Sequence, residues 1–162
     1  MPAVMRAGRS CLGVPMIDSV DADMNRIFTV WHDTVRKRDL AGTAALYAER
    51  AVLETPLALA VYPERNSGLV VGRDAILTFF EDSIRKFPSD LAQWYRTGVY
   101  FVNGKQLTWE YPRVAPAGDQ VDLMEMMDID DGQIVCHRVY WGWHGVKLLA
   151  GALAAADARA SR

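Results

Sequence analysis

Cysteine is scarce in this sequence, which contains only Cys11 and Cys136 among its 162 residues. Cys11 lies near the start of the chain and Cys136 lies in an apolar stretch typical of a strand, so we expect no disulfide between them. Neither cysteine has metal-site spacing, and the histidines His32, His137 and His144 are not spaced as ligands either. Glycine loops that cradle phosphate and GxSxG motifs are also lacking. The sequence therefore implies no metal site and no cofactor.

Long apolar runs and an excess of one charge are absent too. No stretch approaches the roughly 20 apolar residues of a membrane span. The 18 basic and 20 acidic residues are interspersed and leave a net charge of -2, which does not favour nucleic-acid binding. Residues 1–19 have no continuous apolar core, so they predict a flexible leader instead of a secretory signal. We expect a cytoplasmic protein without nucleic-acid or membrane partners, and leave its start open between Met1 and Met16.

The composition is that of an ordinary globular protein, with 51% hydrophobic and 23% charged residues. A chain of this length can bury one real core but not two. We assign residues 20–150 to a single domain that follows the leader. Residues 151–162 form an Ala-rich tail that we expect to fray.

The first half of the chain has helical periodicity. Apolar residues spaced by three and four predict a helix that starts near Asp18; these are Met24, Ile27, Phe28, Trp31 and Val35. A second, short helix should carry Tyr47 on its apolar side. Residues 51–54 predict a short strand, and residues 57–69 predict a loop that could form the rim of a pocket. A third helix should begin at Gly72.

The second half alternates as strands do. It predicts four strands and a final helix over Gly145–Ala155; the strands are Gln93–Asn103, Lys105–Val114, Gln120–Asp130 and Gln133–Trp143. Turn residues between them, such as Asp131-Gly132, are typical of hairpins. Helices followed by a meander of strands predict an α+β fold, in which a curved antiparallel sheet and the helices enclose an apolar small-molecule pocket.

Three segments of the sequence resemble a known superfamily in order and spacing. They are YAERAVLETP at residues 47–56, GRDAI at 72–76, and DGQI at 131–134 with Tyr140-Trp141 after it. Over about residues 20–150 the chain resembles the nuclear-transport-factor-2-like superfamily, which includes ketosteroid isomerases, limonene epoxide hydrolases and SnoaL-like polyketide cyclases. The resemblance implies a cone-shaped sheet wrapped around N-terminal helices. It implies no single activity, because this fold hosts many enzymes and some binding modules.

The resemblance also indicates which residues of this chain correspond to the catalytic residues of ketosteroid isomerases. Their tyrosine falls at Trp31, which has no hydroxyl, and their base falls at Thr55, which cannot take up a proton near neutral pH. Only their third acid has a counterpart, at about Glu125. The resemblance therefore argues against a ketosteroid isomerase mechanism. Epoxide hydrolases of this superfamily use an Asp-Arg-Asp set. The residues here that come nearest to it are Glu110, Arg113 and Glu125, but their spacing differs from that of the set.

Strand parity indicates which residues of the last hairpin share a face. If Trp141 faces the pocket, then Val139 and His137 do so as well. A three-residue turn at 130–132 would place Glu125 opposite His137, whereas a two-residue turn would pair Glu125 with Arg138. Across the preceding hairpin, either Trp109 or Glu110 would face Glu125.

These positions support two hypotheses of different classes. In the first, the protein is a cofactor-independent isomerase, cyclase or hydrolase that acts on a small hydrophobic molecule, with Glu125 and His137 as the acid–base pair. The predicted substrate-binding residues are Trp31, Tyr47, Thr55, Trp109 and Trp141. In the second, the protein is a non-catalytic ligand-binding or dimeric assembly module. Glu125 is then a structural ion-pair partner of Arg138 or Arg113, and the tryptophans are core residues.

The sequence further predicts a homodimer. The sheet face opposite the helices should carry Tyr100, Tyr140 and Trp143, which have no other element to bury them. An exposed apolar patch of this kind is typical of an interface between subunits.

Overall fold

The computed structural model describes residues 19–88, 99–110 and 123–160. The secondary-structure elements follow one another as α1 (Ser19–Lys37), α2 (Leu40–Ala44), β1 (Tyr47–Glu54), α3 (Leu57–Val61), β2 (Leu69–Val71), α4 (Arg73–Lys86), β3 (Phe101–Asn103), β4 (Gln106–Glu110), β5 (Leu123–Asp130), β6 (Gln133–Trp141) and α5 (Trp143–Ala160). Helices come first and most strands follow them, so the predicted α+β class is confirmed. Parts of the first three predicted strands, at 93–98, 111–114 and 120–122, lie outside the described residues.

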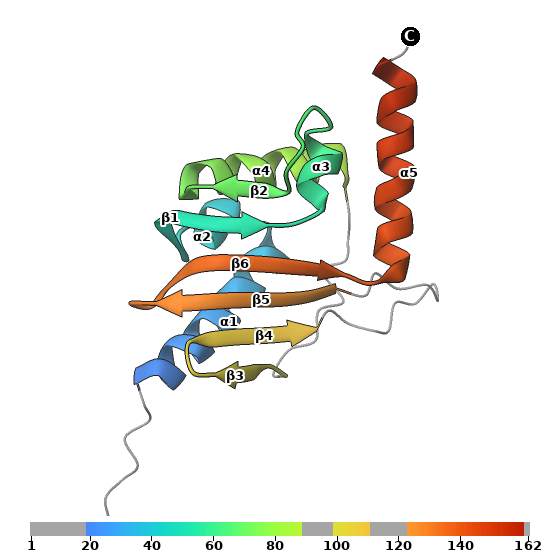
Figure 1. Cartoon of the computed structure of the whole chain (residues 1–162). Coiled ribbons are helices and arrows are strands. Elements are labelled where there is room, and N and C mark those ends of the chain that lie inside the picture. The colour runs from blue at the N-terminus through green and yellow to red at the C-terminus, as the bar shows by residue number, and fades with distance from the viewer. Residues whose placement is uncertain (1–18, 89–98, 111–122, 161–162) are drawn as a thin grey trace, which may run out of the picture.

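The strands form one six-stranded sheet in the order β2-β1-β6-β5-β4-β3 (Figure 1). Strand β1 runs parallel to β6, and the other neighbouring pairs are antiparallel. The sheet is therefore mixed: the strands β3 to β6 form the predicted antiparallel meander, and β1 joins it through one parallel pairing. The parallel pairing places the first strand of the chain beside the last, which brings Tyr47 next to the last hairpin.

Helices α1, α2 and α4 cover one face of the sheet, and the opposite face carries no helix in the part of the chain that the structure describes (Figure 1). Helix α5 stands at the end of β6 and contacts α3. It begins at Trp143 and ends at Ala160, so it is longer at both ends than the predicted helix. None of the helices in the described ranges is long and apolar enough to span a membrane.

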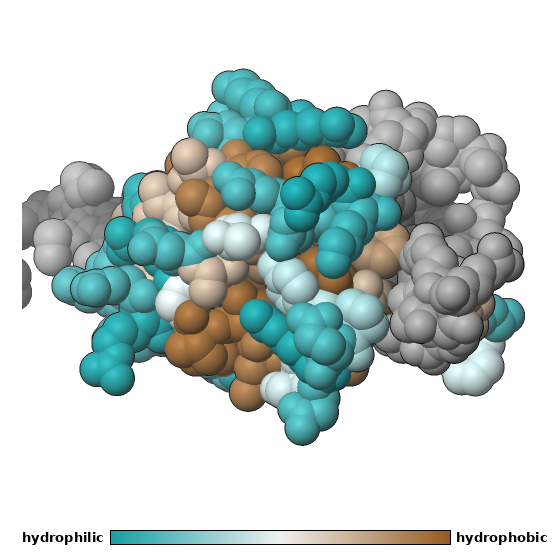
Figure 2. Space-filling view, turned by 90° about the horizontal axis from the view of Figure 1, so that it is seen from above, coloured by the Kyte–Doolittle hydropathy of each residue, from teal (hydrophilic) through white to brown (hydrophobic). Residues whose placement is uncertain are grey.

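The surface mixes hydrophilic side chains with smaller hydrophobic areas, as the view from above shows (Figure 2). Tyr140 is 48% exposed on the uncovered sheet face. The other two residues predicted for that face lie elsewhere. Tyr100 packs its ring 4.6 Å from that of Phe28, on the helix side, and Trp143 belongs to α5. Both expectations were wrong, because β3 begins only at Phe101 and β6 already ends at Trp141, so neither residue lies in the strand predicted to carry it.

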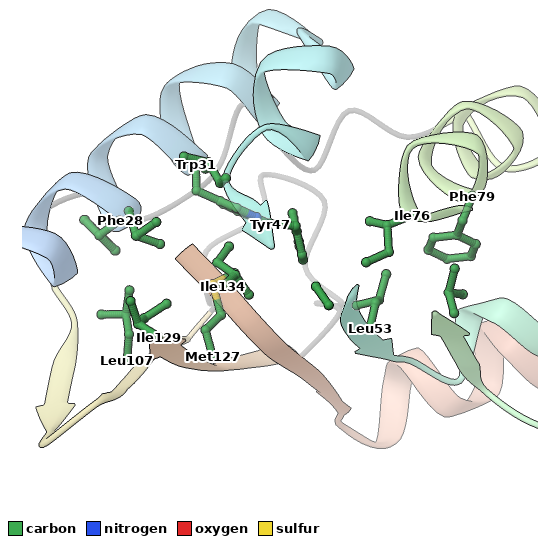
Figure 3. Packing of buried hydrophobic residues seen from close by; sticks show 14 of the residues in the cluster. Phe28, Trp31, Tyr47, Leu53, Ile76, Phe79, Leu107, Met127, Ile129 and Ile134 are labelled. Carbon is green, nitrogen blue, oxygen red and sulfur yellow. The ribbon is translucent and has the colours of Figure 1, made fainter. Parts of the chain in front are cut away.

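The core lies between the helices and the sheet (Figure 3). The predicted apolar stripe of α1 supplies its first layer, since Met24, Ile27, Phe28 and Trp31 are at most 4% exposed. Buried residues of β1, α4 and the sheet complete the cluster; among them are Leu53, Ile76, Phe79, Leu107, Met127, Ile129 and Ile134. Each such side chain contributes about 1.5–3 kcal/mol on burial, so this layer is the main stabilising feature of the fold.

The segment predicted as a loop, residues 57–69, contains the short helix α3 and leads into strand β2. Pro56 precedes α3 with a φ of -58°, which suits a helix start. Ala58, Ala60 and Val61 are buried, so the helix has almost no polar face. Five apolar residues are too few to reveal a helical period, which explains why the sequence pattern missed this element.

The last hairpin combines a tight turn with a β-bulge. Asp131 and Gly132 have φ values of 47° and 68° and form the predicted two-residue turn. The pairing then shifts, because Asp128 lies opposite Cys136 while Ile129 lies opposite Ile134, which leaves Val135 as an extra residue.

The bulge decides which side chains meet. Glu125 lies opposite Val139, and His137 lies opposite Met127, so both predicted registers were wrong. The extra residue nevertheless turns His137 toward the same sheet face as Glu125, as its diagonal neighbour. The two side chains therefore meet because of the bulge, which neither predicted register included.

Candidate functional site

Three buried polar side chains form a hydrogen-bonded chain inside the core. Tyr47 is the first residue of β1, His137 lies in the middle of β6 and Glu125 in the middle of β5. Their exposed fractions are 0%, 2% and 2%. The Tyr47 hydroxyl lies 2.6 Å from Nδ1 of His137, and Nε2 of His137 is hydrogen-bonded to the Glu125 carboxylate. We call these three residues the buried polar chain.

Tyr47 is held by its backbone as well as by its hydroxyl. Nε of Arg73, at the start of α4, donates a hydrogen bond of 2.6 Å to the Tyr47 carbonyl oxygen. The amide of Ile134 on β6 donates to the carbonyl oxygen of the preceding residue, Leu46. The start of β1 is thus tied to both a helix and the last hairpin, which fixes the phenol ring beside His137.

The hydroxyl of Tyr47 is a hydrogen-bond donor that does not ionise easily. Burial raises the pKa of this phenol, and the nearby charge of Glu125 raises it further. A hydrogen bond from Trp31 opposes both effects. The indole nitrogen of Trp31 indeed points toward Tyr47 (Figure 3). Hydrogen bonds can run in one direction, from the Tyr47 hydroxyl to Nδ1 of His137 and from Nε2–H of His137 to Glu125.

Aromatic rings surround the buried polar chain. The ring centroid of Trp31 lies 5.1 Å from that of Trp109 and 6.4 Å from that of His137. Trp109 pairs with Glu125 across the β4–β5 ladder, which settles the choice that the sequence left between Trp109 and Glu110. Apolar walls of this kind lower the local dielectric constant and strengthen the hydrogen bonds inside them.

A second imidazole lies next to this cluster, and sequence reasoning did not assign it to the site. His32 is 3% exposed, and its ring centroid lies 5.1 Å from that of Trp109. Its Nδ1–H donates to the Phe28 carbonyl oxygen at 2.8 Å. Burial lowers the pKa of His32, and the hydrogen bond to Phe28 offsets part of this effect. Its position one residue after Trp31 on α1 was the available signal.

A cavity of about 380 Å³ lies at the ends of β1 and β6, beneath α3 and α5. Its apolar walls come from Pro56, Leu59, Val139, Trp141 and Val146, and Thr55, Glu54 and Arg138 add polar groups. We call this space the strand-end cavity. Its size is within the range of small-molecule sites.

The strand-end cavity adjoins the buried polar chain through one residue. Val139 lies between His137 and Trp141 along β6, lines the cavity and packs against the core. It also pairs with Glu125 across the β5–β6 ladder. Val139 therefore connects the cavity wall to the strand position opposite Glu125.

The structure divides the predicted site residues into two groups. Glu125, His137, Tyr47, Trp31 and Trp109 gather in the buried cluster. Thr55 and Trp141 line the strand-end cavity instead.

The ion-pair alternative for Glu125 has lost one of its two partners. Arg138 pairs with Asp128 at 2.8 Å, and the other candidate partner, Arg113, lies outside the described residues. In the part of the chain that the structure describes, no three His, Cys, Asp or Glu side chains are grouped so as to hold a metal ion.

Several solved structures resemble this chain in fold. A SnoaL-like protein of unknown function from Burkholderia thailandensis is 16% identical, with a TM-score of 0.60 over 75% of this chain and 95% of that one. A Kribbella flavida protein provisionally named a ketosteroid isomerase is 18% identical, with a TM-score of 0.53 over 75% and 78%. An NTF2-like protein of unknown function from Mesorhizobium loti is 25% identical, with a TM-score of 0.51 over 75% and 92%.

Among curated proteins, none matches the chain. The family model of the SnoaL-like domain matches residues 28–137, which run from the second half of α1 to the middle of β6. This match agrees with the resemblance read from the three sequence segments. The chain belongs to the SnoaL-like domain family.

Proposed function

We propose that the protein is a cofactor-independent enzyme that performs acid–base catalysis on a small hydrophobic molecule bound in the strand-end cavity. The observation that carries this proposal is the hydrogen-bonded chain of Tyr47, His137 and Glu125 in an aromatic surrounding. A carboxylate paired with an imidazole in a place of low dielectric constant is suited to proton transfer. The classes that fit are isomerase, cyclase and hydrolase.

Each member of the buried polar chain has a distinct part in this proposal. Glu125 exchanges a proton with the bound molecule, taking it at one position and returning it at another or to the product. His137 holds the carboxylate through Nε2–H. Tyr47 is a positioning residue, because its hydroxyl donates to Nδ1 and so keeps the ring proton on Nε2. The Val139 side chain must move for the substrate to reach Glu125.

The chain lacks two of the three catalytic residues of the ketosteroid isomerase pattern. Trp31 stands where that pattern has its tyrosine, and Thr55 stands where it has its base. In this protein the tyrosine of the cluster, Tyr47, comes from β1 instead of α1. The proposal therefore rests on this chain's own residues.

A second candidate function is a non-catalytic ligand-binding module of the same family. One observation favours it: the three members of the buried polar chain are at most 2% exposed and bond to one another. A purely structural polar network has the same appearance. The strand-end cavity would then bind a ligand without converting it.

The proposed test separates these two functions. A panel of small hydrophobic compounds is screened for binding and for conversion, and the first compound converted is used with Glu125→Gln and Glu81→Gln. Glu81 is exposed on α4, so its variant is the matched control. Acid–base catalysis by Glu125 predicts a loss of about 10²- to 10⁴-fold in kcat/KM for Glu125→Gln alone. Full turnover in a folded Glu125→Gln protein would contradict the proposal.

We also infer a homodimer that uses the uncovered face of the sheet. Met124, Met126 and the exposed Tyr140 share this face of β5 and β6, because Met124 pairs with Tyr140 and alternate residues point the same way. Light scattering at micromolar concentration should give twice the mass of one chain, and Tyr140→Lys should lower it. A monomeric wild-type protein would refute the inference.

A further inference from the structure

Arg73 joins helix α4 to the backbone of Tyr47. Its Nε donates a hydrogen bond of 2.6 Å to the Tyr47 carbonyl oxygen. The donor is a guanidinium, and hydrogen bonds from charged donors are about twice as strong as those between neutral groups. Arg73 is half-buried, so water competes less for this bond than for one on the surface. The contact is therefore suited to hold the strand at this point.

The sheet by itself holds the start of β1 weakly. Tyr47 pairs with Ile134 of β6, and the pairing of these two strands resumes only at Val52. On the other edge of β1, strand β2 pairs with residues 52–54. Tyr47 thus lies outside the continuous part of both ladders. The bond from Arg73 acts where the strand has few ladder contacts of its own.

Helix α4 is a firm support for Arg73. Two side chains of the helix, Ile76 and Phe79, are at most 2% exposed and lie in the core (Figure 3). Just before the helix, Gly72 has a φ of 95°, which glycine adopts without strain, and its amide donates to the Ala51 carbonyl oxygen at 2.8 Å. Arg73 is the first residue of α4, so these contacts fix its position.

The position of the Tyr47 backbone determines where its hydroxyl lies. The phenol is a rigid group, so a displacement of the backbone moves the hydroxyl oxygen by a similar amount. That oxygen lies 2.6 Å from Nδ1 of His137, and a hydrogen bond weakens steeply when its distance and angle depart from the optimum. Arg73 can therefore act on His137 through Tyr47, without contacting the ring.

We propose that Arg73 is a positioning residue, which holds the Tyr47 hydroxyl on Nδ1 of His137 by fixing the Tyr47 carbonyl. The ring proton then stays on Nε2, beside Glu125. This inference rests on the proposed function for the view that the proton position serves catalysis. The positioning itself requires no turnover, so the two claims can fail separately. It also gives a physical role to the GRDAI segment at residues 72–76.

The test compares the ¹⁵N NMR signals of the His137 ring in wild-type, Arg73→Met and Arg73→Lys proteins. Methionine keeps an unbranched stem without a donor, whereas lysine keeps both a charge and a donor. Arg73→Met should shift the Nδ1 signal in the same direction as Tyr47→Phe does, by a smaller amount, and Arg73→Lys should shift it less. Arg85→Met is the matched control, because Arg85 lies in the last turn of α4 with its side chain 72% exposed, and it should leave the signal unchanged.

A double-mutant cycle shows whether Arg73 acts through the Tyr47 hydroxyl. Arg73→Met is repeated in the Tyr47→Phe protein, and positioning predicts that it causes no further shift of the His137 signal. A direct effect of the lost charge, or a general loosening of the fold, would give the same shift in both backgrounds. Thermal unfolding confirms that each variant is folded.

The kinetic consequence is measured with the compound that the activity screen identifies. Arg73→Met should lower kcat about 3- to 10-fold, as the weakening of one hydrogen bond would do, and leave KM unchanged. Arg85→Met should change neither value.

The outcomes separate the positioning role from the proposed function. An Nδ1 signal unchanged by Arg73→Met, equal shifts in Arg73→Met and Arg73→Lys, or additive shifts in the double-mutant cycle would overturn the role of Arg73. Any of these results together with a Glu125→Gln loss of turnover would leave the proposed enzyme standing. The predicted NMR shifts with an unchanged kcat in Arg73→Met would contradict a part for Arg73 in catalysis.

Discussion

The buried polar chain and the strand-end cavity are neighbours through Val139 and differ in how their polar groups are satisfied. In the buried polar chain, Tyr47, His137 and Glu125 bond to one another. Trp141 lines the cavity, and its buried indole nitrogen has no hydrogen-bond partner among the described residues. The members of the buried polar chain thus satisfy one another, whereas the Trp141 indole nitrogen is not satisfied by any described residue. This difference predicts that removing one polar group from each region will change the free energy of unfolding by very different amounts.

The largest effect should follow the loss of His137. His137→Ala leaves the Glu125 carboxylate and the Tyr47 hydroxyl buried without their shared partner. Removing the hydrogen-bond partner of a buried carboxylate leaves its charge uncompensated and costs about 3–5 kcal/mol, so we expect a loss of this size in the free energy of unfolding. Urea denaturation followed by circular dichroism measures it. A loss below about 0.5 kcal/mol, the size of an ordinary surface substitution, would mean that the chain is not the tight network described.

Tyr47→Phe should have an intermediate effect. The substitution keeps the ring and removes one hydrogen bond, which leaves Nδ1 of His137 without its donor. We expect a loss of about 1–3 kcal/mol in unfolding free energy. Tyr62→Phe is a suitable control, because the Tyr62 hydroxyl bonds to Asp82 in a partly buried place where water can replace it. Equal losses in the two variants would mean that burial adds nothing to the bond of Tyr47.

A smaller effect concerns His32 and pH. Its folded-state pKa lies below the ordinary value of 6.5 because burial disfavours the charged ring. The unfolded chain therefore binds a proton at a higher pH than the native protein does. The contribution to stability is complete above about pH 6.5 and declines as the pH falls, by at most about 1.4 kcal/mol per pH unit.

His32→Gln tests this dependence. Between pH 7 and pH 5 the variant should lose less unfolding free energy than the wild-type protein, as measured by denaturation at each pH. The control is a comparison above pH 7, where the difference between the two proteins should stay constant. Parallel curves over the whole range would show that His32 is not responsible.

The smallest effect should come from the cavity. Trp141→Phe removes a donor that has no partner in the described part of the protein, so without ligand it should change the unfolding free energy by no more than about 1 kcal/mol. The same denaturation experiment serves as the measurement. A loss as large as that of Tyr47→Phe would erase the contrast between the two regions.

The sequence predicted the fold better than the contacts inside it. The period of α1 and the alternation of β5 and β6 come from burial of one face, which a sequence records directly. The β-bulge at Val135 leaves no such record, and both predicted registers of Glu125 were wrong for that reason. Pairing in a bulged hairpin depends on tertiary packing as well as on the turn.

The site itself was predicted in part. The meeting of Glu125 and His137 was expected, but Tyr47 was placed on a helix, although it opens β1 and bonds to His137. The sequence pattern could not distinguish a helical from a strand position for Tyr47, since Leu46 and Tyr47 come shortly after the end of α2 at Ala44 and are both buried. The division between a packed cluster and a cavity also depends on α3 and α5, whose packing no short pattern reveals.

The most direct measurement for the buried polar chain is the ¹⁵N NMR spectrum of the His137 ring in wild-type and Tyr47→Phe proteins. Donation from Tyr47 to Nδ1 and from Nε2–H to Glu125 predicts that the ring carries its proton on Nε2 and none on Nδ1. Removing the Tyr47 hydroxyl should shift the Nδ1 resonance. A wild-type ring that carries its proton on Nδ1, or an Nδ1 signal unchanged by Tyr47→Phe, would contradict this arrangement and the positioning role proposed for Tyr47.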